Sequence, residues 1–134
     1  MKGKLIILLS ILLIVFTSCD YGKVRNTKVI DVPSEIYDKE DILDAIEAAK
    51  RYFKHAFTGC ELLEIYYAGD DSYDEMKEWA DQYNEDEAII LLSDFYVGPD
   101  GGDGSLNTDS TYEDWNWIFV RNDNGRWRHK THGY

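Results

Sequence analysis

A run of consecutive apolar residues at Ala88–Leu92 (AIILL) limits the fold of this chain more than any other feature. A strand made only of apolar residues has no face for water, so such strands lie at the centre of a sheet that is covered on both faces. The run continues to Val97, where Gly98-Pro99 ends it. We therefore expect a central strand at 88–97, with other elements packed on both sides of it.

Two helices and a strand are predicted before this central strand. A stripe of apolar residues at helical spacing predicts a helix over 39–57, with Asp38 as its cap. The stripe consists of Ile42, Ile46, Ala49, Phe53 and Phe57. Residues 60–67 (CELLEIYY) predict a strand. Ser72 and Glu75 have the spacing of a capping box, which predicts a second helix that runs to about residue 83.

A β-hairpin is predicted at the C-terminal end. Two segments, 115–121 (WNWIFVR) and 126–130 (RWRHK), flank the turn-forming sequence Asn-Asp-Asn-Gly at 122–125. Alternation places Trp115, Trp117 and Phe119 on one face of the first strand. A polar, glycine-rich segment at 98–110 (GPDGGDGSLNTDS) predicts a long loop before the hairpin.

These elements predict an α+β fold, with a helix packed on a twisted, mostly antiparallel sheet in the order α-β-α-β-β-β. A short β segment is also expected around Val29–Val32. The order resembles the cone-shaped, nuclear-transport-factor-two-like and cystatin-like α+β folds. The runs SDF, GGDGSLN, WNW and a closing Gly-x-Trp resemble small uncharacterised lipoproteins of Gram-positive bacteria over roughly residues 38–134. This resemblance implies a fold and no catalytic residue.

The first nineteen residues have the pattern of an export signal. Lys2 and Lys4 precede an apolar stretch at 5–16, and Thr17-Ser18 stand directly before Cys19. Small residues followed by cysteine resemble the lipobox of bacterial lipoproteins. In that family the signal is removed before the cysteine, and the cysteine sulfur is diacylated.

The lipobox resemblance implies a signal peptide at 1–18, a lipidated Cys19 with a tether to residue 37, and one domain at 38–134. The protein would then be anchored in the cell membrane and face its extracytoplasmic side, with the lipid bilayer as a partner. Two alternatives stay open. Secretion without lipid would put bulky Phe16 at a position that favours small residues. An uncleaved anchor would span the bilayer with a stretch of only about 18 Å, against about 30 Å of hydrocarbon.

The charge is strongly acidic and unevenly distributed. The formal net charge is −12, and residues 61–114 carry 17 acids with Lys77 as their only base. Such a surface argues against binding nucleic acid or an anionic lipid face, because both carry negative phosphates. Two interpretations of the acidic surface stay open: it keeps the protein soluble, or it recognises a cationic protein or small ligand. Once Cys19 carries lipid, Cys60 has no cysteine to pair with, and we expect it to be a buried apolar residue.

Asp94 is the one candidate for a catalytic group. It interrupts an apolar strand, so its carboxylate must be paired or must face a cavity. In a cone-shaped fold an aspartate in a pocket can serve as a general base if its pKa is raised. The alternative is an ion pair with Arg121, Arg126 or Arg128.

The glycine-rich loop contains candidate ligands for a metal ion. The oxygen-bearing side chains of the glycine-rich loop are candidates for calcium ligands, although neither an EF-hand nor a repeated calcium motif is complete. They are Asp100, Asp103, Asn107 and Asp109. His129 and His132 are expected on opposite faces of a strand and therefore as no zinc pair. We predict no cofactor.

Three tryptophans are candidates for an exposed platform that binds a sugar, a peptide or another ligand: Trp115, Trp117 and Trp127. The sequence as a whole favours a non-enzymatic, membrane-anchored binding domain. Two other hypotheses stay open, a pocket enzyme that uses Asp94 and an acidic immunity or inhibitor protein that covers a basic toxin.

Overall fold

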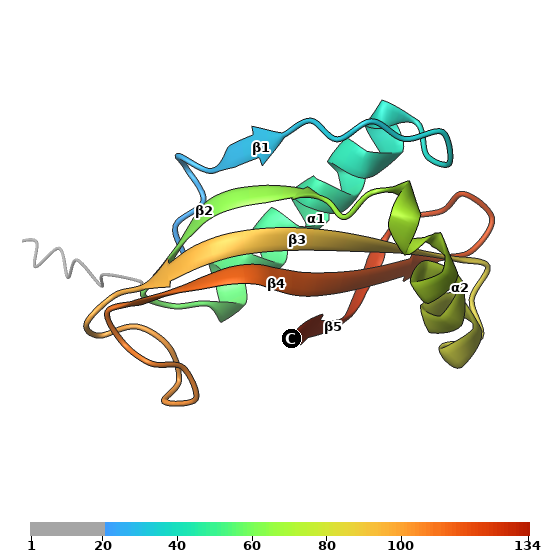
Figure 1. Cartoon of the computed structure of the whole chain (residues 1–134). Coiled ribbons are helices and arrows are strands. Elements are labelled where there is room, and N and C mark those ends of the chain that lie inside the picture. Colours follow the sequence, from blue (N-terminus) through green and yellow to red (C-terminus); the bar gives the residue numbers. More distant parts are fainter. Residues whose placement is uncertain (1–20) are drawn as a thin grey trace, which may run out of the picture.

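The strand expected from the apolar run is β3 (Glu87–Val97), the middle one of five strands in a single sheet. The computed structural model describes residues 21–134, and its strands lie in the order β1-β2-β3-β4-β5 (Figure 1). The other strands are β1 (Lys28–Ile30), β2 (Cys60–Tyr67), β4 (Ser110–Arg121) and β5 (Arg128–Gly133). Strand β1 is parallel to β2, and every other neighbouring pair is antiparallel.

The first helix, α1 (Lys39–Ala56), packs across one face of this sheet (Figure 1). Its apolar stripe is buried as predicted, and Phe53 is fully inaccessible. Phe53 packs edge-on against Phe95 of β3, and Phe57, directly after the helix, lies against Trp117 of β4. Aromatic side chains thus form the contact between α1 and the sheet, and each buries a large apolar area.

The second helix, α2 (Tyr73–Gln82), covers the opposite face at one end of the sheet (Figure 1). Alternation along the strands points Ala88 and Ile118 to this side, where Met76 and Trp79 of α2 lie beside them. The predicted capping box is wrong, because the Ser72 side chain makes no cap hydrogen bond. A 3-10 turn at Asp70–Ser72 leads into the helix instead, and it leaves Ser72 in a conformation that an N-cap residue does not adopt.

The N-terminal segment lies along the domain from Gly22 onward, within the part of the chain where we expected a tether. The Lys23 N–H donates to the carbonyl of Cys60, and the Leu62 N–H donates to the carbonyl of Lys23. The Thr27 hydroxyl donates to the Leu62 carbonyl at 2.9 Å, just before β1 joins the sheet edge. The segment from Lys23 to Ile30 is therefore held by β2, and the N–H of Gly22 before it is held by α1.

The α+β class is confirmed, and the strands differ from prediction mainly at the hairpin. Strand β4 begins at Ser110, five positions before the expected 115, and β5 covers 128–133 instead of 126–130. The turn forms as predicted: Asp123 and Asn124 both have positive φ, as in a type I′ turn, and the Gly125 N–H donates to the Asn122 carbonyl. Two further residues, Arg126 and Trp127, separate this turn from β5.

A register shift in the hairpin decides which side chains of β5 face α1. Ile118 pairs with Thr131, and the next residue, Phe119, pairs with His129, so β5 has one extra residue at Lys130. A bulge of this kind reverses the alternation of side chains beyond it. Among the described residues 21–134, no helix is long and apolar enough to cross a membrane.

Candidate functional site

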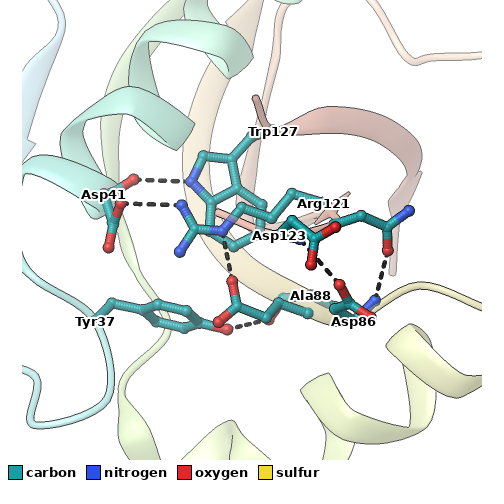
Figure 2. Close-up of polar contacts among 9 residues, drawn as sticks. Tyr37, Asp41, Asp86, Ala88, Arg121, Asp123 and Trp127 are labelled. Carbon is teal, nitrogen blue, oxygen red and sulfur yellow. Dashed lines mark hydrogen bonds and ion pairs between the residues drawn. The ribbon is translucent and has the colours of Figure 1, made fainter. Parts of the chain in front are cut away.

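Two clusters of polar and aromatic side chains are candidates for a functional site. The first surrounds Arg121, whose side chain is only 5% exposed. Its guanidinium donates to the Asp41 carboxylate of α1 at 2.9 Å and to the Glu87 carboxylate of β3 (Figure 2). It also lies over the indole of Trp127, 4.1 Å from the ring centroid, and the Trp127 Nε1–H donates to the Asp41 carbonyl. Burial alone would lower the pKa of Arg121, but the two carboxylates raise it.

This arginine cluster joins elements that are distant in the sequence. It links α1, β3, β4 and the segment after the hairpin turn, and Figure 2 shows its members directed toward one another. Tyr37 beside it donates its hydroxyl to the Ala88 carbonyl, and burial raises the pKa of that hydroxyl. Because the buried guanidinium is already paired with two carboxylates of the domain, the cluster stabilises the fold and has no cation available for a ligand.

The second cluster lines a cavity of about 410 Å³ between the C-terminal end of α1 and the sheet, which we call the aromatic pocket. This volume is within the usual range for small-molecule sites. Its lining residues come from α1, β2, β4, β5 and the glycine-rich loop: Tyr52, Ala56, Phe57, Cys60, Gly102, Asp103, Ser105, Leu106, Trp115 and His132.

Close backbone contacts hold the glycine-rich loop (residues 98–109) at the rim of the aromatic pocket. The Gly102 N–H donates to the Thr58 carbonyl at 2.8 Å, and the Gly98 N–H donates to the Gly59 carbonyl at 3.1 Å. A Cβ on Gly101 would lie 2.5 Å from the Gly59 oxygen, so only glycine permits this approach. Gly101 therefore has a specific role, because its close approach to Gly59 holds the loop where Asp103 and Leu106 line the pocket.

Two histidines of β5 lie on the face that α1 covers, so the prediction that they point to opposite faces is wrong. The bulge at Lys130 compensates for their odd spacing and brings the His129 and His132 rings to 5.3 Å between centroids. Tyr52 of α1 stacks on His129 at 4.0 Å and also contacts His132. Among residues 21–134, no three His, Cys, Asp or Glu side chains gather to hold a metal ion.

The surroundings of both histidines favour the neutral form. Burial, followed by the charge of His132, lowers the pKa of His129 from 6.5 to about 4, and burial also lowers the pKa of His132. The Trp115 Nε1–H donates to Nδ1 of His132 at 3.2 Å, which places the His132 proton on Nε2. The pocket wall that His132 contributes is therefore uncharged at neutral pH.

Cys60 lies at the floor of the pocket. Its side chain is 1% exposed, as the sequence predicts, and burial raises the pKa of its thiol. A reactive cysteine requires a thiolate, which an electropositive environment promotes and burial opposes. The Cys60 thiol is consequently an apolar wall of the pocket and not an activated nucleophile.

Asp94 lies away from the aromatic pocket. Its neighbours in β3, Ser93 and Phe95, are fully buried toward α1, so Asp94 points to the other face of the sheet. Its carboxylate accepts the N–H of Asp114, a residue with positive φ at the bulge of β4. The expected ion pair with an arginine is wrong, because the carboxylate stabilises the backbone of a β-bulge instead.

The predicted calcium ligands do not converge. Asp103 accepts the N–H and hydroxyl of Ser105, and these bonds lower the pKa of its carboxyl. Asp109 accepts the hydroxyl of Tyr96, and Tyr112 provides a hydroxyl oxygen for the N–H of Asn107. Asp100 is exposed at the start of the loop.

The three candidate tryptophans have separate environments. Trp115 lines the aromatic pocket, Trp117 is fully buried with its Nε1–H on the Ser93 hydroxyl, and Trp127 belongs to the arginine cluster. They therefore form no common platform. Sequence reasoning missed Tyr52, Phe57 and His132 as pocket residues; the only signal was that aromatic residues concentrate near the end of the first helix.

Comparison with protein-family models, with curated proteins and with solved structures finds no match for this chain. The interpretation of the site therefore depends on its own geometry. Cys19, the predicted lipidation site, lies outside the described residues.

Proposed function

We propose that this protein is a membrane-anchored, extracytoplasmic binding domain whose ligand site is the aromatic pocket. The single observation that carries the proposal is the pocket itself. It is a cavity of about 410 Å³ with an aromatic wall, and a few polar groups lie at its rim. Ligand sites in proteins combine mostly apolar walls with a small number of placed polar groups.

The chemistry of the lining supports binding rather than catalysis. Nδ1 of His132 is occupied by Trp115, and the Cys60 thiol is kept protonated by burial. A nucleophile needs a base within hydrogen-bond reach, and no such bond joins these two side chains in the structure. The Ser105 hydroxyl at the rim donates to Asp103, but this bond lowers the pKa of the Asp103 carboxyl and so makes it a weak base.

The start of the folded domain supports an anchor close to the pocket. Gly22 is hydrogen-bonded to Lys54 at the end of α1, three positions after Cys19 in the sequence. Three residues span at most about 11 Å. Lipid on Cys19 would therefore hold the C-terminal end of α1, and with it the pocket rim at Ala56, near the membrane surface.

We further propose that the domain belongs to the cone-shaped, nuclear-transport-factor-two-like class. The support is the long helix α1 across one face of a twisted sheet, with a cavity beside the C-terminal end of that helix.

Fractionation of cells that express the full chain tests the anchor. Cys19→Ser should move the protein from the membrane fraction to the soluble fraction, because the acylated sulfur is lost. Cys60→Ser is the matched control and should stay with the membrane. If the Cys19→Ser protein remained in the membrane fraction as wild type does, the anchor would be refuted.

Nuclear magnetic resonance with a set of small-molecule fragments tests the pocket. We expect the largest shift changes at Tyr52, Phe57 and the Trp115 indole. Trp115→Leu should abolish them, whereas Trp79→Leu on the opposite face of the sheet should not. Shift changes that cluster elsewhere, or none at any residue, would contradict the assignment of the pocket as the ligand site.

A further inference from the structure

We infer that the aromatic pocket takes a small organic cation, an ammonium group that carries alkyl substituents. The inference rests on the proposed function, because it assumes that this pocket is the ligand site, and it adds the chemical class of the ligand. Three features of the lining support it: its charge, its aromatic rings and the hydrogen bonds that orient its one carboxylate.

The charge of the pocket is negative. Among the described residues that line it, Asp103 is the one with a charged side chain, and neither lysine nor arginine is present. The imidazole of His132 is neutral because its Nδ1 accepts a hydrogen bond from the Trp115 Nε1–H in a partly buried site. The last turn of α1 carries Lys54 and His55, but both side chains are exposed outside the lining. An anionic ligand would therefore meet a carboxylate without a cation to pair with it.

The aromatic rings favour a cation with an apolar body. Tyr52, Phe57 and Trp115 contribute three rings to one cavity. The face of an aromatic ring has a negative quadrupole, and groups of such rings bind alkylated ammonium ions while they also cover the alkyl groups. Tyr52 is held in place by stacking on His129, and Trp115 is held by its bond to His132, so both rings are ordered before a ligand enters.

The carboxylate of Asp103 is ready to accept an ammonium proton or to face a quaternary nitrogen. The Ser105 N–H and hydroxyl both bind Oδ1, which orients the group and leaves Oδ2 as an acceptor. The acidic surface adds to this effect, because a net charge of −12 raises the local concentration of cations. Charge complementarity thus selects a cation over a neutral molecule of equal shape.

The same ammonium chemistry occurs in free small molecules and in lipid headgroups. A pocket whose rim lies beside the anchored end of the domain is accessible to both sources. The test therefore includes a soluble cation and a lipid that displays the same group.

Binding of choline and of its neutral isostere 3,3-dimethylbutan-1-ol to the full chain in dodecyl maltoside micelles tests the inference. The readout is the shift of the Tyr52 backbone N–H, which wild type and every variant retain, in nuclear magnetic resonance titrations. We expect choline to bind about tenfold more tightly than the isostere, as a cation–π contribution predicts. Equal or tighter binding of the neutral alcohol would overturn the inference and leave the pocket as a binding site. Binding of neither compound would overturn both proposals.

Variants separate the contribution of the Asp103 carboxylate to binding from that of the aromatic rings. Asp103→Asn should weaken choline about fivefold and leave the neutral isostere unchanged, whereas Asp100→Asn, in the same loop but outside the lining, should change neither. Trp115→Leu should weaken both ligands. If Asp103→Asn left choline binding at the wild-type value, the cation would not be recognised by this pocket.

Mixed micelles identify the source of the ammonium group. Phosphatidylcholine added to the micelles that displaces choline, when phosphatidylglycerol does not, would assign a lipid headgroup. Choline binding that neither lipid changes would assign a free small molecule.

Discussion

The backbone N–H of Gly22 donates a hydrogen bond of 2.9 Å to the carbonyl oxygen of Lys54, which fixes the N-terminal segment against the end of α1. The contact is so close that a Cβ on Gly22 would lie 2.3 Å from the Phe53 oxygen and 3.0 Å from the Phe57 oxygen. The position therefore requires glycine for space, although its φ is ordinary.

Gly22→Ala should detach this segment from α1 and lower the free energy of unfolding by about 2 kcal/mol, through overpacking and loss of the Gly22–Lys54 bond. Urea unfolding followed by circular dichroism measures the change. Gly104→Ala is the control, since a Cβ there meets no atom within 4 Å and adds only the strain of positive φ, about 1 kcal/mol. Equal stability of Gly22→Ala and wild type would show that the close contact does not persist in solution.

Arg121→Met should destabilise the domain by about 2–4 kcal/mol, because it leaves the Asp41 and Glu87 carboxylates near one another without their cation. The lower end of the range allows for their side-chain exposures of 32% and 35%, which let water replace part of the interaction. Thermal or urea unfolding measures the loss. Arg126→Met is the matched control, because Arg126 is exposed, and it should change stability by less than about 0.5 kcal/mol.

A double-mutant cycle gives the sharper test of this cluster. If Arg121→Met and Asp41→Asn act through their shared bond, the double variant should be less destabilised than the sum of the single variants. Additive losses would mean that Arg121 stabilises the fold through Glu87 and its packing on Trp127, and not through Asp41.

Helices and strands whose bounds follow from the local sequence pattern were predictable. Features that depend on how two strands pair were not. Residues 60–67 form β2 at the predicted bounds, and the first helix ends one residue before the predicted end. In contrast, the bulge at Lys130 has no signal in the local sequence, because it arises from the register between β4 and β5. That bulge places His132 in the aromatic pocket, so the pocket could not be assembled from the sequence.

The N-terminal segment illustrates the same limit. Polar residues and a proline made 20–36 look like a linker, but the edge of β2 pairs with it: the Lys23 N–H donates to the Cys60 carbonyl, and the Lys23 carbonyl accepts the Leu62 N–H. A parallel pairing of this kind connects residues that are far apart in the chain, and it needs no apolar pattern at the edge. Propensity alone gives no indication of it.

Cys60 should be unreactive in the folded protein, because its side chain is 1% exposed and burial raises the pKa of its thiol. In a Cys19→Ser background it is the only thiol of the chain, so a chromogenic thiol reagent reports on it alone. We expect the reaction at pH 8 to be about 100-fold slower in buffer than in denaturing urea. A native rate close to the urea rate would indicate that the floor of the aromatic pocket opens to solvent.

His129 should make the domain sensitive to acid at pH values at which most carboxylates are still ionised. Its pKa falls from the ordinary 6.5 to about 4 in the folded state, first because of burial and then because of His132. The stacked Tyr52 ring and the Trp117 and Phe119 rings provide no charge that would favour the cation. Below about pH 6.5, His129 binds a proton in the unfolded chain but stays unprotonated in the folded protein. The free energy of unfolding therefore declines as the pH falls from 6.5 toward 4. Allowing for partial solvation, the decline attributable to this residue is on the order of 1–2 kcal/mol.

His129→Phe should remove this part of the pH dependence, because phenylalanine retains the stack on Tyr52 and cannot be protonated. The measurement is the free energy of unfolding in urea at pH 7 and at pH 4.5, for wild type and variant. His55→Phe, at an exposed position on α1, should keep the wild-type slope. The carboxylates contribute equally to the pH dependence of stability in all three proteins. The difference between the slopes therefore isolates the contribution of His129. If the His129→Phe protein lost as much stability between these pH values as wild type does, the histidine would be solvated in the folded state and the bulge at Lys130 would not hold it against α1.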